Sequence, residues 1–393
     1  GLNRYDKKTG EFMRFEADIN NPESLTHSSI WCIVKDQQGS LWMGTYFGGV
    51  NYFNPEYEIY TRFKMSTKEE DGLSSPIVSH MLEDKHGNLW IATEGGGLNK
   101  YDPKTKTFKW YKHIPGQNSI SQNNIKALYY DTDHDCLWIG THLGSLNKLD
   151  LKTDLFTNYP SKEGDNESLP SNIIRDIVPY KDSLIIATQN GVCMFNPADG
   201  KCRQMFKDIK LGHSIKMVAS LFFDHEGTLW IAATGEGVFA YRFDTNELTN
   251  YRHDPKDSTS LSNNNVNDIT ESHYNDLWFS TSGSGIDRYN YKTKTFENFD
   301  MQSNGLSSDC VYSVCESRYG KLLVITNKGF SQFDQSSKSF YNYTIEDGFP
   351  LMTANENALY LSADGEVFLG GVTGLISFNE KDLRFAPKPY NII

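Results

Sequence analysis

The run LWMGT at residues 41–45 returns along the chain at a nearly constant interval, and this repetition determines the class of fold. It recurs as LWIAT at 89–93, LWIGT at 137–141, LIIAT at 184–188, LWIAA at 229–233, LWFST at 277–281, LLVIT at 322–326 and VFLGG at 367–371. The second residues of these runs lie 45 to 48 positions apart, a spacing typical of β-propeller blades. These anchor residues are Trp42, Trp90, Trp138, Ile185, Trp230, Trp278, Leu323 and Phe368.

Each repeat has the pattern of four short strands. An apolar strand such as VSHMLED at 78–84 precedes the anchor strand, and a tight turn containing glycine joins the two. A glycine-rich bend leads to a third strand, and a turn leads to a fourth, such as FKWYKH at 108–113 or YTRF at 60–63. Ser/Asn-rich segments such as 116–124 have loop composition and connect the repeats. We therefore predict an all-β propeller of four-stranded blades with the anchors buried between blades.

The repeats predict eight blades, or seven if one terminal repeat belongs elsewhere. The outer hairpins number nine, because YDKKTGEF at 5–12 matches both YDPKTKTF at 101–108 and FNEKDLRF at 378–385. The surplus strand pair within residues 1–15 either completes the last blade and closes the ring, or ends an upstream repeat. In this interpretation residues 1–393 form a single propeller.

Composition excludes several classes of function. The net charge is −12 and no basic run occurs, which argues against nucleic-acid binding. The sequence has no apolar run of 18 residues, so we expect membrane attachment only through segments outside it. The six cysteines match no metal-binding spacing, and we predict no metal and no cofactor. Cys193 and Cys202 flank a hairpin turn; we favour two free thiols over a disulfide, because hairpin neighbours rarely meet disulfide geometry.

One face of a propeller carries both the entrance of each first strand and the bend after each second strand. The position two residues past the entrance of the first strand is apolar in every repeat, whereas the entrance position varies and is mostly polar. That column is Trp31, Ser79, Lys126, Arg175, Ala219, Asn267, Tyr312 and Asn357. The column at the bend is equally varied: Tyr46, Glu94, His142, Gln189, Thr234, Ser282, Asn327 and Val372. Such variation within a repeat favours a binding site, although loop ends are also polar simply because they face water.

These columns predict a ligand site over the central channel. Aromatic rings stack on sugar faces, and amide and charged groups bond to hydroxyls, so the residue types suit a carbohydrate. The stacking candidates are Trp31, Tyr46 and Tyr312, and the hydrogen-bonding candidates are Glu94, Lys126, His142, Arg175 and Asn267. Glu94 and His142 have the chemistry of an acid and a base, but repeat spacing does not place them within reach of each other, and we predict no catalytic residue.

The stretches DQQGSLWMGTYFGGVNYF at 36–53 and DKHGNLWIATEGGGLNKYD at 84–102 resemble the two-component regulator propeller repeat. The repeats at 173–203 and 311–341 depart from the pattern because they lack the anchor tryptophan. The resemblance implies the periplasmic sensor part of a hybrid histidine kinase that detects oligosaccharides from polysaccharide breakdown. Because a ring whose blades each pack on two neighbours should be rigid, we expect such a sensor to signal through association of chains, as a dimer. It also implies that the kinase and the membrane helix lie outside this sequence. The alternative is a propeller enzyme acting on glycans, a lyase or glycosidase.

Overall fold

The computed structural model describes residues 1–7, 9–19, 24–37, 39–54, 59–206, 215–344, 348–350 and 353–383. The chain divides into two compact units rather than the single one that the repeats predict. The smaller comprises Gly1–Tyr60 with Glu346–Phe349, and the larger comprises Thr61–Ile345 with Pro350–Ile393. Among the described helices, none is long and apolar enough to cross a membrane.

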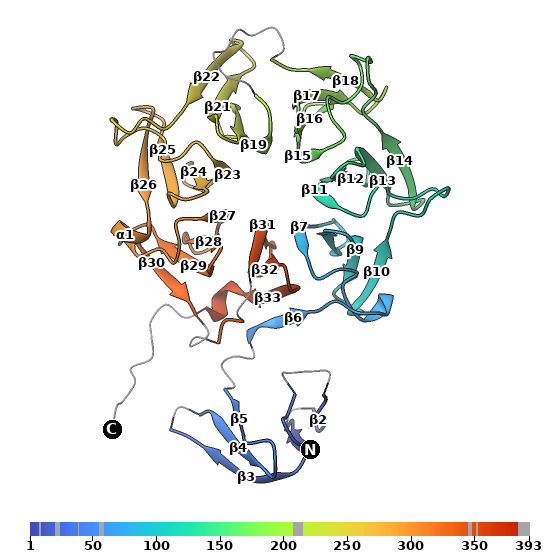
Figure 1. Cartoon of the computed structure of the whole chain (residues 1–393), viewed down its shortest axis with the longest axis vertical. Helices are drawn as coiled ribbons and strands as arrows, with labels where there is room; N and C mark the ends of the chain where they lie inside the picture. Colours follow the sequence, from blue (N-terminus) through green and yellow to red (C-terminus); the bar gives the residue numbers. More distant parts are fainter. Residues whose placement is uncertain are drawn as a thin grey trace. The chain divides into compact units, whose positions relative to one another are not determined.

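The described part of the larger unit forms a closed ring of seven four-stranded antiparallel sheets (Figure 1). The innermost strand of each sheet contacts the innermost strands of both neighbours, including β31 with β7. These inner strands are β7 (Val78–Glu83), β11 (Ile125–Asp131), β15 (Ile174–Tyr180), β19 (Val218–Phe223), β23 (Val266–Glu271), β27 (Val311–Glu316) and β31 (Ala354–Leu361). The β-propeller class predicted from the repeats is confirmed.

The anchor strands are second in each sheet: β8 (Leu89–Thr93), β12 (Cys136–Thr141), β16 (Ser183–Thr188), β20 (Leu229–Ala233), β24 (Leu277–Thr281), β28 (Leu322–Thr326) and β32 (Glu366–Gly371). The third strands are β9 (Gly97–Asp102), β13 (Leu146–Asp150), β17 (Gly191–Asn196), β21 (Gly237–Arg242), β25 (Ile286–Asn290), β29 (Gly329–Asp334) and β33 (Leu375–Asn379). The outermost strands are β10 (Thr107–Tyr111), β14 (Leu155–Tyr159), β18 (Lys201–Gln204), β22 (Glu247–Tyr251), β26 (Thr295–Phe299), β30 (Ser339–Tyr343) and β6 (Thr61–Phe63). Short helical turns lie at η2 (Glu69–Asp71), α1 (Met301–Asn304) and η4 (Glu380–Asp382).

The ring is closed by β6, which comes from its amino-terminal end and pairs with β33 from the other end, with Phe63 opposite Leu375. Sequence analysis instead assigns 60–63 to the first repeat and considers the pair within 1–15 as the closing element. That pair, β1 (Leu2–Tyr5) and β2 (Phe12–Phe15), forms its own two-stranded sheet in the smaller unit. The prediction of an outer hairpin at 378–385 is also wrong, because the short helical turn η4 follows β33 directly. Residues 384 and 385 lie outside the described part.

The repeat anchored at Trp42 is not part of this ring. Its strands β3 (Ile30–Lys35), β4 (Leu41–Thr45) and β5 (Val50–Phe53) form a three-stranded sheet in the smaller unit. The repeat count of eight therefore includes one repeat that contributes no sheet to the ring, and the strand expected to be its fourth, β6, belongs to the last sheet of the ring instead.

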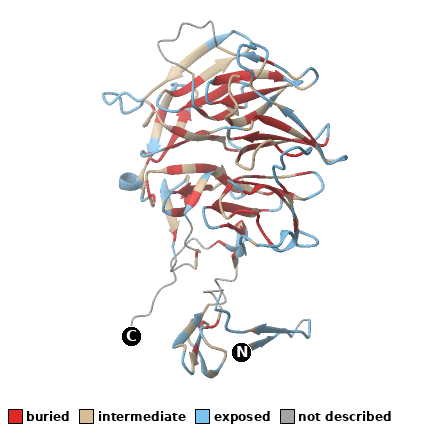
Figure 2. Ribbon diagram, turned by 45° about the vertical axis from the view of Figure 1, so that its right-hand side comes forward, coloured by how far each residue is buried: buried red, intermediate tan, exposed pale blue. Residues whose placement is uncertain are grey.

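The core of the ring lies between adjacent sheets, where seven of the eight predicted anchors are buried (Figure 2). The prediction is wrong for the eighth, Trp42, which is exposed in the smaller unit because no second sheet of that unit covers it. Trp90 is 1% exposed and packs in one cluster with Leu128 and Ile139 of the following sheet. Its indole Nε1 donates to Asp84 at 2.8 Å, and Trp230 makes the equivalent bond to Asp224. In two repeats the aspartate is replaced, by Thr132 before Trp138 and by Ser272 before Trp278. In both repeats no described group accepts a hydrogen bond from the buried indole N–H.

The interpretation of Cys193 and Cys202 as free thiols is wrong. The two residues lie on the paired strands β17 and β18, and their side chains form a disulfide with a Cα–Cα distance of 6.1 Å. That distance lies within the range that disulfides require.

Candidate functional site

The inner strands of the ring share an irregularity close to where each begins. In β7 the pairing with β8 passes from Val78 directly to His80, and the residue between them is skipped. Such a bulge leaves one residue without a cross-strand partner and redirects its side chain. The residues skipped in this way are Ser79, Lys126, Arg175, Ala219, Asn267 and Tyr312. They are the members of the predicted entrance column in six of the seven sheets. The entrance position found from repeat spacing is therefore the position of the bulge.

The seventh inner strand has a longer irregularity. Pairing of β31 with β32 is interrupted between Ala354 and Leu359, and Asn357 within this stretch has a φ of 55°. Asparagine tolerates this left-handed backbone conformation better than most residues do. The departure from regular pairing brings Asn355, Glu356 and Asn357 to the same pocket.

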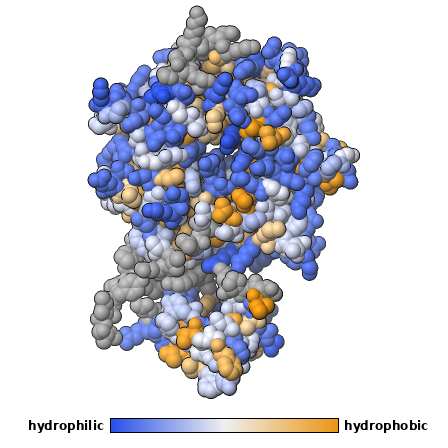
Figure 3. Space-filling view, in the orientation of Figure 1, coloured by the Kyte–Doolittle hydropathy of each residue, from blue (hydrophilic) through white to orange (hydrophobic). Residues whose placement is uncertain are grey.

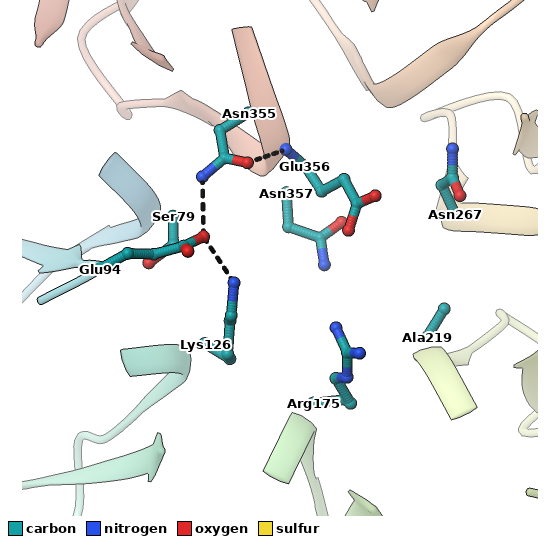
Figure 4. Close-up of a pocket in the computed structure, with 9 residues that line it drawn as sticks. All are labelled: Ser79, Glu94, Lys126, Arg175, Ala219, Asn267, Asn355, Glu356 and Asn357. Atoms are coloured by element: carbon teal, nitrogen blue, oxygen red, sulfur yellow. Dashed lines mark hydrogen bonds and ion pairs between the residues drawn. The ribbon is translucent and has the colours of Figure 1, made fainter. Parts of the chain in front are cut away.

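Side chains from six inner strands and one bend meet in a pocket of about 40 Å³, which we call the channel mouth (Figure 4). Residues almost 280 positions apart in the sequence are neighbours here, because the first strands of all sheets converge around the axis of the ring. The channel mouth is lined by Ser79, Glu94, Lys126, Arg175, Ala219, Asn267, Asn355, Glu356 and Asn357.

Glu94 is held by two donors within the channel mouth. Lys126 Nζ and Asn355 Nδ2 both donate to its Oε1, at 2.5 and 3.2 Å (Figure 4). Burial raises the pKa of Glu94, but the hydrogen bonds from Lys126 and Asn355 outweigh it, so the pKa lies below its ordinary value. Glu94 is therefore ionised and paired with Lys126, which is the opposite of what a general acid requires.

Arg175 differs from Lys126 because its charge is not compensated. Its side chain extends into the channel mouth (Figure 4), and no group in the described chain forms a hydrogen bond or ion pair with the guanidinium. The charge of Arg175 affects His142. Burial, Arg175 and Lys126 together lower the pKa of the imidazole, and the negative charge of Glu94 cancels only part of this lowering. His142 is therefore neutral at pH 7, and the positive charge beside it belongs to Arg175.

Three polar residues of the channel mouth connect neighbouring sheets. Ser79 Oγ donates to the carbonyl of Ile125 at 2.7 Å, Asn267 Nδ2 to that of Val311 at 2.7 Å, and Asn355 Nδ2 to that of Val78 at 2.9 Å. In each case the acceptor is on the next inner strand around the ring. These side chains fix the spacing of the strands at the rim, so part of the polarity of the column has a structural explanation.

The eight residues proposed from sequence are distributed over two units. Glu94, Lys126, Arg175 and Asn267 line the channel mouth. His142 is close enough to Lys126 and Arg175 for their charges to affect its pKa, whereas Tyr312 occupies the bulge of β27 without lining the pocket. Trp31 and Tyr46 belong to the smaller unit, where their ring centroids are 5.1 Å apart. They do not line the channel mouth of the ring.

Two further features were missed by the sequence analysis. Asn355 and Glu356 reach the pocket only because of the long irregularity in β31, which repeat spacing does not reveal. The second is the layer one residue deeper along the inner strands, a cavity of about 150 Å³ whose lining includes His80, Asp176, Ser220, Asp268, Ser313 and Asn357. The column from His80 to Ser313 is mostly polar, like the entrance column, and that polarity was a signal available in the sequence.

Burial governs the charges of this deeper layer. It raises the pKa of Asp176 and of Asp268 to about 6, and it lowers the pKa of His80 to about 4. Each aspartate also accepts a main-chain N–H from the next inner strand, from Leu221 for Asp176 and from Val314 for Asp268. At pH 7 the layer therefore carries two carboxylates and a neutral imidazole.

Three segments of the chain, residues 24–47, 72–95 and 260–283, match the family described as two component regulator propeller. These three segments of the chain are therefore similar to repeats of that family. Over 84 residues it is 31% identical to Histidine kinase P4 of Formosa agariphila, an alignment that covers 21% of this chain and 6% of the kinase.

Solved structures show the same fold. The chain is similar to the extracellular domain of a B. thetaiotaomicron protein assigned to the hybrid two component systems, with a TM-score of 0.79 and 24% identity over 95% of this chain and 48% of the other. For a second such domain from B. thetaiotaomicron the TM-score is 0.66 and the identity 20%, over 96% of this chain and 50% of the other. For virginiamycin B lyase of Staphylococcus aureus the TM-score is 0.61 and the identity 10%, over 81% of this chain and 98% of the lyase. The chain thus spans about half the length of the two sensor-system chains, and at these identities the likeness concerns the fold.

Proposed function

We propose that this ring is the ligand-sensing propeller of a hybrid two-component signalling system, located outside the cytoplasm in the periplasm, and that it responds to oligosaccharides from polysaccharide breakdown. The observation that carries the proposal is the channel mouth. It collects different, mostly polar residues at one repeat position, whereas the position two residues further along each inner strand stays apolar, in a chain with segments that match the repeats of two-component regulators. Amide, hydroxyl and charged groups around a pocket suit a ligand rich in hydroxyls.

Glu94 favours sensing over catalysis. A glycan lyase or glycosidase needs a side chain that gives or takes a proton near neutral pH, and such a group usually has a raised carboxylate pKa. The Glu94 pKa is lowered, and its described hydrogen-bonding partners are Lys126 and Asn355. The carboxylates whose pKa burial does raise, Asp176 and Asp268, lie in the deeper layer, where each accepts a main-chain N–H of the next inner strand. The likeness to virginiamycin B lyase is one of fold and does not supply a catalytic pair.

The signal would pass through association of chains. A ring in which every inner strand packs on two neighbours resists internal rearrangement. Dimer formation or reorientation is then the step that reaches a kinase elsewhere in the protein. Small-angle scattering of the full-length receptor's extracytoplasmic region, with and without a ligand that binds, should show a change of dimer population or shape. An unchanged monomer in both states would contradict this mode of signalling.

Thermal denaturation with a panel of defined oligosaccharides tests the ligand class. A ligand at about 100 times its Kd stabilises the native state by about 2.7 kcal/mol, which is readily detected as a rise in Tm. We expect at least one oligosaccharide to stabilise the chain and to be recovered without cleavage. A panel with no stabilising member would contradict oligosaccharide sensing, and the appearance of cleaved products would establish the enzyme alternative.

A further inference from the structure

The channel mouth contains four charged side chains, and they are not equivalent. Lys126 and Glu94 neutralise each other in a direct ion pair. Arg175 and Glu356 carry no side-chain ion pair or hydrogen bond to any described group. Glu356 is exposed, so water solvates it, whereas Arg175 is partly buried at the edge of the pocket. A partly buried charge without a partner costs free energy that a ligand of opposite charge recovers.

The space beside Arg175 is open on one side. The preceding inner strand brings Lys126, and the following inner strand brings Ala219, whose single methyl group leaves room next to the guanidinium (Figure 4). The pocket volume of about 40 Å³ matches about three water-sized sites, since one water needs about 10–15 Å³ of such volume. A carboxylate or a sulfate has this size, whereas a complete sugar ring is larger. The channel mouth therefore fits one terminal group of a ligand.

The deeper layer confines an anion to the channel mouth. Asn357 lines both cavities, so the deeper one lies next to the channel mouth. Asp176 and Asp268 lie in the deeper one and are ionised at pH 7, which makes entry of a second negative charge unfavourable. An anion that enters from the rim is thus attracted by Arg175 and stopped by the aspartates.

We propose that the channel mouth binds a small anionic group at the end of the ligand, a carboxylate or a sulfate, through the Arg175 guanidinium. The planar guanidinium presents two parallel N–H donors that match a carboxylate or a sulfate edge. This inference rests on the proposed function, because it takes the channel mouth as the ligand site. It narrows the ligand class to oligosaccharides that end in a uronic acid or a sulfated sugar.

The test compares D-glucuronate, D-glucose 6-sulfate and D-glucose at equal ionic strength, with binding to the chain followed by NMR titration. We expect one or both anions to bind and glucose to bind at least tenfold more weakly. Preference for glucuronate assigns the site to carboxylates, and preference for the sulfate ester assigns it to sulfated sugars. Arg175→Gln should weaken binding of the anion by about tenfold to a hundredfold, the effect of losing a charge-assisted hydrogen bond. The affinity of Arg175→Lys for the anion should lie between those of wild type and Arg175→Gln, since lysine keeps the positive charge but lacks the paired N–H donors of the guanidinium.

The matched control is Arg203→Gln, which removes an exposed arginine from β18 of the same sheet and should leave binding unchanged. Equal anion binding by wild type and Arg175→Gln would overturn the inference, and so would equal losses in both variants. Its failure is separable from failure of the proposed function. If neutral oligosaccharides stabilise the chain and Arg175→Gln does not alter their binding, sensing stands and the anionic terminus is wrong. If no saccharide binds at all, both are wrong.

Discussion

The sheets that contain Trp42 and Trp90 have nearly the same sequence and different surroundings. In both, the indole Nε1 donates to the aspartate six residues earlier, at 2.9 Å to Asp36 and at 2.8 Å to Asp84. Yet Trp42 is 45% exposed in the smaller unit, and Trp90 is 1% exposed in the ring. The repeat therefore determines the hairpin and its hydrogen bond, whereas burial of the anchor requires a second sheet against it.

The same contrast holds for the whole sheet β3–β5. Apolar side chains are exposed on the smaller unit (Figure 3), and they include Trp31, Ile33, Val34, Phe47, Val50 and Tyr52. In the ring the inner positions Met81, Leu128, Ile177, Leu221, Ile269 and Val314 are buried. Repetition of sequence thus does not guarantee repetition of environment, and mutations at equivalent positions of the two units should have unequal effects.

The largest expected effect is that of Trp90→Ala. Removal of a buried indole leaves a cavity between two sheets, and such changes cost about 3–5 kcal/mol of unfolding free energy. Urea denaturation of the ring, followed by tryptophan fluorescence and circular dichroism, measures this cost. Trp42→Ala is the matched control and should cost under about 1 kcal/mol, the scale of a surface change. Equal costs at the two positions would contradict the difference in burial.

An intermediate effect is expected when the acceptor is removed instead of the indole. Asp84→Ala leaves the buried Trp90 N–H without a partner and frees the turn at 84–88, and we expect a loss of about 2 kcal/mol. Asp36→Ala should cost roughly a third of that or less, because water reaches the exposed Trp42 indole. The urea midpoints of the two variants, compared with that of wild type, measure the two losses of stability. A larger loss of stability for Asp36→Ala than for Asp84→Ala would show that the smaller unit buries its anchor.

The smallest effect concerns pH and the layer behind the channel mouth. There the ring carries Asp176 and Asp268, and the smaller unit carries Cys32 at the corresponding position. Burial raises both aspartate pKa values to about 6, above the value of about 4 in an unfolded chain, so the folded state binds protons more tightly. Their contribution to stability is complete below pH 4 and is lost as the pH rises through 6.

The measurement is the difference in unfolding free energy between wild type and the Asp176→Asn Asp268→Asn double variant across that range. Wild type should lose stability relative to the variant from pH 4 to pH 7, by on the order of 1 kcal/mol because water in the channel screens the charges. The corresponding control is Cys32→Ser, whose difference from wild type should not change between pH 4 and pH 7. A flat difference for the aspartate variant would show that these carboxylates are ionised at low pH as ordinary ones are.

Anchor spacing and turn chemistry suffice for the fold class, for the hairpin around each anchor and for the entrance column, whose residues lie at the bulges. Each of these depends on contacts within about 50 residues, where strand alternation and short glycine turns leave one register. The same spacing located Glu94, Lys126, Arg175 and Asn267 at the channel mouth. It could not reveal Asn355 and Glu356, because the irregularity in β31 breaks the count.

Ring closure was decided by tertiary structure alone. In sequence β6 follows β5, but in the structure it pairs with β33 near the other end of the chain, and this partner becomes available only when the ring closes. The charge state of the channel mouth was decided in the same way. In sequence Lys126 and Arg175 are two similar cations one repeat apart, but in space the bend that carries Glu94 reaches Lys126 and not Arg175. Repeat spacing alone places both cations near the axis, whereas convergence of the strands decides that Lys126 is neutralised and Arg175 is not.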